Sequence, residues 1–166
     1  MPRAKRLYLP LLVAAAALLA GSTLAGAEGA TYVGQAKCKA CHLTEHKTWS
    51  ATKHATALEA LPADARGKAE CLSCHMTGYG KPAAEGADLN GVQCESCHGP
   101  GSDYKSMQIM SKKEYAANRE AAHAKSVGAG LILPDEAACK SCHNEKSPNF
   151  KGFDFAAAKE RIKHWK

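Results

Sequence analysis

The chain has 166 residues and a formal net charge of +6, with three Phe and two Trp but 14 Gly and eight Cys. This length limits it to one modest domain, and so few large apolar side chains exclude an ordinary hydrophobic core. No basic run is interleaved with aromatic residues, so the positive charge does not indicate a nucleic-acid partner.

Residues 1–27 have the pattern of an export signal. A basic start, an apolar run from Leu7 to Leu19 and the small residues Ala25-Gly26-Ala27 follow one another. The apolar run is shorter than the about 20 residues that span a bilayer, so we expect cleavage near Ala27 and no retained membrane anchor. The remainder, residues 28–166, would be one periplasmic or exported domain with a formal charge of +3, because three of the basic residues lie before the cleavage site.

The pattern Cys-x-x-Cys-His then occurs four times and uses every cysteine of the chain. It is the attachment signature of a c-type haem, in which the two cysteines bind the porphyrin and the His binds its iron. The sequence therefore predicts four haem c groups. The expected covalent anchors are Cys38, Cys41, Cys71, Cys74, Cys94, Cys97, Cys139 and Cys142. The expected proximal iron ligands are His42, His75, His98 and His143.

Two other uses of the cysteines have some support in their number and spacing. Nineteen residues separate Cys74 from Cys94, which is within the range of zinc ribbons, and eight cysteines in an exported chain are also compatible with a disulfide scaffold. Neither use gives a reason for a His directly after every second Cys.

Between and after the motifs, short helices and turns are expected. The sequence predicts a helix with a break or two from Leu43 to Leu61, capped by Thr44. A loop from Thr77 to Gly91 follows the second motif, and Gly99-Pro100-Gly101 stops any helix after the third.

Three helices are expected in the last third of the chain. The capping box that begins at Ser111 opens a helix through Ser126, a short helix after Asp135 enters the fourth motif, and Asp154 caps a last helix through Trp165. The predicted fold is a small multihaem cytochrome c, mainly α with little or no β, whose helices and loops wrap four stacked haems that serve as its core.

Four histidines lie outside the motifs. His54, His123 and His164 are expected to be distal iron ligands, one for each of three haems. His46 is a further candidate, but it lies one helical turn beyond His42 and would have to reach a different haem.

The stretches around the first three motifs resemble the cytochrome c-554 family of tetrahaem proteins. They are Tyr32 to His42, Trp49 to His54, Cys71 to Tyr79 and Gly91 to Ser102. The resemblance implies stacked haem pairs in a mostly helical protein that carries electrons in the periplasm, as the type member does from hydroxylamine oxidoreductase. It also implies that His54 serves the third haem, His123 the first and His164 the fourth, while the second resembles a five-coordinate site.

The expected function is electron transport between redox partner proteins, with no catalytic residue required. One alternative is an enzyme that converts a nitrogen oxide or hydroxylamine at an open haem on Cys71 and Cys74. Another is a subunit of an extracellular haem filament, in which His46 binds an iron of the neighbouring chain.

Overall fold

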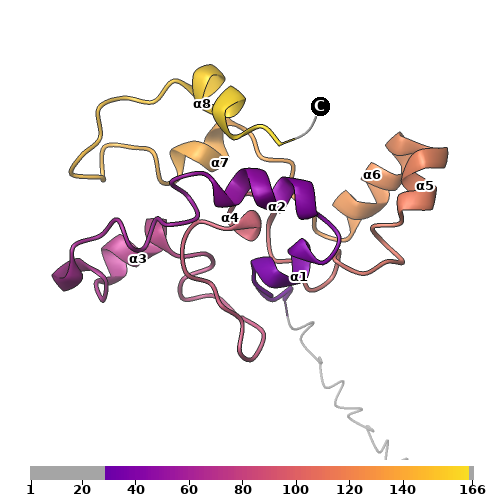
Figure 1. Cartoon of the computed structure of the whole chain (residues 1–166), viewed down its shortest axis with the longest axis horizontal. Helices are drawn as coiled ribbons and strands as arrows, with labels where there is room; N and C mark the ends of the chain where they lie inside the picture. Colours follow the sequence, from indigo (N-terminus) through magenta and orange to yellow (C-terminus); the bar gives the residue numbers. More distant parts are fainter. Residues whose placement is uncertain (1–28, 165–166) are drawn as a thin grey trace, which may run out of the picture.

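The computed structural model describes residues 29–164, in which short helices are joined by turns and long loops (Figure 1). The export signal expected over residues 1–27 and the expected helix end at Trp165 lie outside this part. The helices are α1 (Gln35–Lys39), α2 (Leu43–Ser50), the 3-10 helix η1 (Ala63–Ala65), α3 (Ala69–His75), α4 (Cys94–His98), α5 (Lys112–Ala117), α6 (Arg119–Gly128), α7 (Glu136–Lys140) and α8 (Phe155–Ile162).

Extended pairing is limited to isolated bridges within residues 29–164. They join Tyr32 to Ala83 and Met76 to Asn90 and Gly91. The prediction of a mainly α fold with little or no β is confirmed. No helix in the described part is long and apolar enough to cross a bilayer.

Side-chain caps begin α5 and α8 as the sequence predicted, and α7 has one as well. Ser111 Oγ accepts a hydrogen bond from the backbone N–H of Glu114 at 3.2 Å, and Asp135 and Asp154 accept equivalent bonds from the third residues of α7 and α8. Each bond satisfies an N–H that has no partner inside its helix, which stabilises a helix by about 1 kcal/mol.

The helix expected over Leu43 to Leu61 is much shorter than predicted. It ends at Ser50, its N-cap is His42 without a side-chain cap, and Thr44 lies inside it, so the prediction of Thr44 as the cap is wrong. Beyond the helix end, Thr52 donates both its N–H and its hydroxyl to the carbonyl of Trp49, at 2.9 and 2.7 Å. A hydroxyl that occupies a backbone carbonyl in this way favours turns over continued helix.

The helix expected from Ser111 through Ser126 is broken into α5 and α6 by Asn118. This residue is extended, with φ −153° and ψ 95°, and its side chain accepts a hydrogen bond from the N–H of Ala121 at 3.0 Å. Asn is a strong N-cap and a poor interior helix residue, so it begins a second helix instead of continuing the first.

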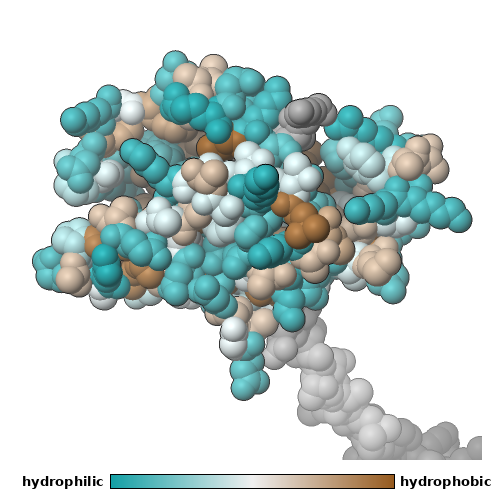
Figure 2. Space-filling model, in the orientation of Figure 1, coloured by the Kyte–Doolittle hydropathy of each residue, from teal (hydrophilic) through white to brown (hydrophobic). Residues whose placement is uncertain are grey.

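The helices spread around a very small core. In Figure 1, α2 crosses the middle, α3 lies on one side and the α5–α6 pair on the other, with α7 and α8 above. The buried hydrophobic residues of the described part are Val33, Ala57, Ala65, Leu72, Tyr104 and Ala122. The face seen in Figure 2 is mostly hydrophilic, with hydrophobic side chains scattered over it. Side chains this few and small do not form an ordinary apolar core.

Candidate functional site

Each of the four motifs is built on a helical turn. The third motif is α4 itself, and the second forms the end of α3. The first and fourth run past the ends of α1 and α7, yet the N–H of His42 still bonds to the carbonyl of Cys38, and that of His143 to the carbonyl of Cys139, both at 3.0 Å. Residues three apart share one side of such a turn, so both cysteines of a motif can face one flat group.

Cysteines of different motifs are neighbours. The thiol of Cys38 lies near that of Cys94, and Cys94 contributes to the raised pKa of Cys38. The thiol of Cys142 likewise lies near Cys74, which adds to the effect of burial in raising the pKa of Cys142. Burial, followed by the charges of other cysteines in the third and fourth motifs, raises the pKa of the free Cys97 thiol to about 11. The motifs therefore lie in a series in which the first adjoins the third, the third adjoins the fourth and the fourth adjoins the second.

This arrangement bears on the other uses of the cysteines. All eight are free of disulfide bonds. The zinc-ribbon spacing would bring Cys74 and Cys94 to one metal, whereas the structure places each of them against a cysteine of another motif.

Two proximal histidines are oriented by backbone carbonyls. His75 Nδ1 lies 2.6 Å from the carbonyl oxygen of Ala57, and His98 Nδ1 lies 3.0 Å from that of Ile132. A hydrogen bond donated by Nδ1 assigns the proton to that nitrogen and leaves Nε2 as the metal-binding atom. His42 is exposed instead, and its Nδ1 lies 3.9 Å from a carboxylate oxygen of Glu45.

Two of the expected distal histidines face proximal ones. The ring centroids of His54 and His143 are 6.0 Å apart, and those of His98 and His164 are 6.1 Å apart. Two metal–nitrogen bonds of about 2.0 Å, with roughly 1.1 Å from each nitrogen to its ring centre, span about 6.2 Å, so the separation of both pairs fits an iron between the rings.

These pairs differ from the pairing that the resemblance implied. The structure sets His54 against the fourth motif and His164 against the third, whereas the reverse was expected. Burial, and then the nearby His143, lowers the pKa of His54, and burial also lowers that of His98. A lower pKa favours the neutral imidazole, which is the form that binds a metal.

The remaining two candidate ligands contact other side chains. His46 Nε2 lies 2.5 Å from Gln35 Oε1, and its ring lies edge-on to Trp49 with centroids 5.2 Å apart. His123 on α6 lies against Tyr115 on α5, with ring centroids 5.5 Å apart.

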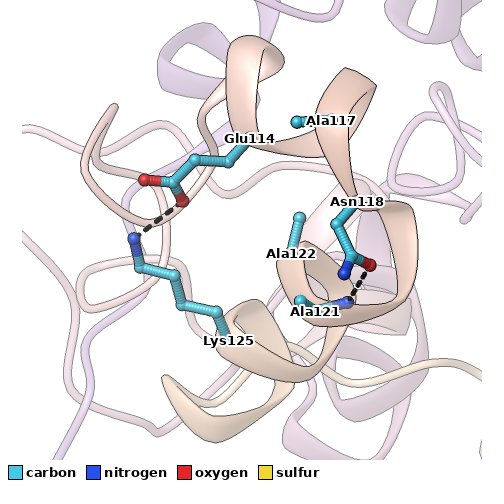
Figure 3. A pocket seen from close by; sticks show the side chains of 6 residues that line it. All are labelled: Glu114, Ala117, Asn118, Ala121, Ala122 and Lys125. Atoms are coloured by element: carbon cyan, nitrogen blue, oxygen red, sulfur yellow. Dashed lines mark hydrogen bonds and ion pairs between the residues drawn. The ribbon is translucent and has the colours of Figure 1, made fainter.

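A small cleft lies between α5 and α6. Its volume is about 270 Å³, and the ion pair between Lys125 and Glu114 crosses its mouth at 2.8 Å (Figure 3). It is lined by Glu114, Ala117, Asn118, Ala121, Ala122 and Lys125. The alanines of these helices therefore serve partly to let α5 and α6 pack together.

Two residues near the motifs were missed by the sequence analysis. Phe153 stacks on His143, with ring centroids 4.7 Å apart and planes at 15°. Glu95, between the cysteines of the third motif, is 1% exposed. The sequence does single out Glu95, because the equivalent residues of the other motifs are Lys39, Leu72 and Lys140, none of which is acidic. No feature of the sequence indicates the position of Phe153.

The chain is similar in sequence and in structure to known cytochromes. Residues 37–99 match the family described as cytochrome c554 and c-prime. Cytochrome c-554 of Nitrosomonas europaea is 28% identical in an alignment that covers 89% of this chain and 71% of the relative. The solved structure of reduced cytochrome c554 from Nitrosomonas europaea is similar with a TM-score of 0.57 and 28% identity, covering 75% of this chain and 71% of that one.

Proposed function

We propose that this chain, which belongs to the cytochrome c-554 family, is an exported electron carrier with four covalently bound c-type haems. Membership makes it a c-type cytochrome of electron transfer; the haem count, the export and the partners are our proposal. The supporting observation for the count is that four attachment motifs consume all eight cysteines.

The continuous series of motifs is the observation that carries the function. Electrostatic interactions between cysteines connect the first motif with the third, the third with the fourth and the fourth with the second. Groups attached at neighbouring motifs would be held close together, as an electron path through a small protein requires. Discrete, separated sites would instead be typical of a protein that binds its cofactors for independent reactions.

The residues of the chain have defined parts in this function. A c-type haem, when bound, supplies a one-electron couple whose potential depends on its axial ligands, hydrogen bonds and burial. The carbonyls of Ala57 and Ile132 hold His75 and His98 in the tautomer that presents Nε2. The neighbouring rings of His54 and His143 would each donate a nitrogen to one iron.

The partners are proposed to be redox proteins that give and accept electrons at exposed edges of the array. The export signal expected over residues 1–27 supports a periplasmic location, because c-type haems are attached outside the bacterial cytoplasm. The direction of flow follows from the relative potentials of those partners.

The test is a count of haems and electrons on the exported protein. We expect a mass increase of four haems, sharp c-type bands on reduction, and uptake of four electrons in a potentiometric titration. A chain without these bands, or one with fewer than four haems under conditions of full maturation, would overturn the proposal.

One observation favours a second candidate function, that of an enzyme with an open second haem. His46, a candidate for closing the second haem, is engaged with Gln35 and Trp49. An open second site could reduce a small nitrogen compound such as nitric oxide or hydroxylamine. A low-temperature spin-state measurement decides, since one high-spin haem supports the open site and an entirely low-spin protein eliminates it.

A further inference from the structure

The carboxylate of Glu95 is buried where the first and third motifs meet. Its Oε1 accepts hydrogen bonds from the N–H groups of Val33 at 2.9 Å and Gly101 at 2.6 Å, and its Oε2 accepts one from Gly34 at 2.8 Å. Both oxygens accept and every donor is a backbone amide, so the surroundings match a carboxylate, whose oxygens only accept hydrogen bonds. A negative charge is therefore fixed inside the protein.

This charge is not neutralised by a basic side chain. None of the ion pairs found within residues 29–164 includes Glu95. Backbone dipoles stabilise the carboxylate but leave its net charge in place. The charge consequently acts on whatever lies beside it.

Neighbouring groups respond to this field. Burial raises the pKa of the Tyr32 hydroxyl, and the charge of Glu95 raises it further. Burial and then nearby acidic groups, Glu95 among them, also raise the pKa of Tyr104. The field reaches the free thiols of Cys38 and Cys94 as well, which are the anchors of the first and third haem sites.

We propose that Glu95 lowers the reduction potentials of the first and third haem sites by presenting an uncompensated negative charge to both. The inference rests on the proposed function, because it requires haems at these motifs. Reduction removes one positive charge from an iron centre, so a nearby buried anion favours the oxidised state. A buried unit charge at such a site shifts a one-electron equilibrium by roughly tenfold, which is about 59 mV.

Glu95 also joins the segment Val33–Gly34 to Gly101 through its hydrogen bonds, so a structural part has to be separated from an electrostatic one. A merely structural role would change stability or haem content without moving potentials in a charge-dependent direction. The reduction potential is therefore the readout, supported by its dependence on salt.

The test compares two isosteric variants of the holoprotein. Glu95→Gln removes the buried charge, while Glu70→Gln removes an exposed one directly before Cys71. We expect Glu95→Gln to raise two of the four reduction potentials by about 59 mV each, which corresponds to a change of roughly tenfold in the equilibrium constant for reduction. The shift should be the same at low and at high ionic strength. Glu70→Gln should produce a smaller shift that salt suppresses, because exposed charges are screened.

Unchanged potentials in a fully loaded Glu95→Gln protein would overturn the inference. If that variant does not acquire its haems, Glu95→Asp decides: loading with potentials near the wild type supports the charge, and failure of both variants assigns Glu95 a purely structural part and also overturns it. A wild-type protein without four haems would count against the proposed function instead, so the two failures are distinguishable.

Discussion

The imidazole rings of His54 and His143 face each other across 6.0 Å, although one follows α2 and the other follows α7. This separation leaves room for one metal ion between two nitrogens. The turn after α2 is therefore placed by its relation to the fourth motif as much as by its own sequence.

Replacing His54 should open one iron to a weaker ligand. We expect His54→Ala to convert one of the four haems from low spin to high spin, because an axial imidazole is lost. Electron paramagnetic resonance at low temperature measures the change. His46→Ala is the matched control, since that ring contacts Gln35 and Trp49, and its spectrum should match the wild type. A new high-spin signal in the control alone would reverse the roles of the two histidines.

Gly91 is expected to tolerate no side chain. Its φ is +81°, and a Cβ there would lie 2.7 Å from the carbonyl oxygen of Ala55 and 3.1 Å from that of His54. Gly91→Ala should therefore lower the free energy of unfolding by more than the about 1–2 kcal/mol expected for alanine in the left-handed conformation. It should also displace His54. Gly80→Ala is the control. Gly80 has a φ of +71° and no atom lies within 4 Å of a Cβ there, so this variant has the backbone strain without the clash. Guanidinium unfolding of both holoproteins gives the difference, and equal losses would contradict the clash.

The hydroxyl of Tyr104 should contribute measurably to stability. It donates a hydrogen bond of 2.8 Å to the carbonyl of Gly99, and the residue is 5% exposed. Tyr104→Phe leaves that buried carbonyl without this donor, which costs about 1–3 kcal/mol. Tyr79→Phe is the control, because Tyr79 is 41% exposed and no hydrogen bond to its hydroxyl is found within the described residues. A free energy of unfolding that falls equally in both variants would argue against this account.

Removal of the haems should unfold most of the chain. The described residues bury only six hydrophobic side chains, and three of those are alanines. Burying so little apolar surface cannot offset the conformational entropy of ordering the backbone. Apoprotein made without haem attachment should therefore lose most of its helical circular dichroism. A native-like far-ultraviolet spectrum of the apoprotein would show that the polypeptide folds by itself.

The helical class and the attachment motifs were predictable because their chemistry is local. A Cys-x-x-Cys-His motif carries its spacing within five residues, and the caps at Asp135 and Asp154 satisfy N–H groups three residues away. The expected scarcity of apolar core followed from composition in the same way.

The pairing of distal histidines was not predictable because it depends on contacts between distant segments. Nothing near His164 in the sequence indicates that its ring reaches His98. The early end of α2 and the break at Asn118 were missed for a subtler reason, since Thr52 and Asn118 are tolerated in helices and only their side-chain hydrogen bonds decide against it.

The nearness of the Cys38 and Cys94 thiols also constrains how the molecule is made. Thiols in contact can oxidise to each other and then exchange with further thiols, whereas a thioether bond takes no part in such exchange. A polypeptide that adopted its final shape too early would risk cross-linking the anchors of two different sites. Porphyrin attachment is therefore best completed on an open chain, with compaction as the closing step of biosynthesis.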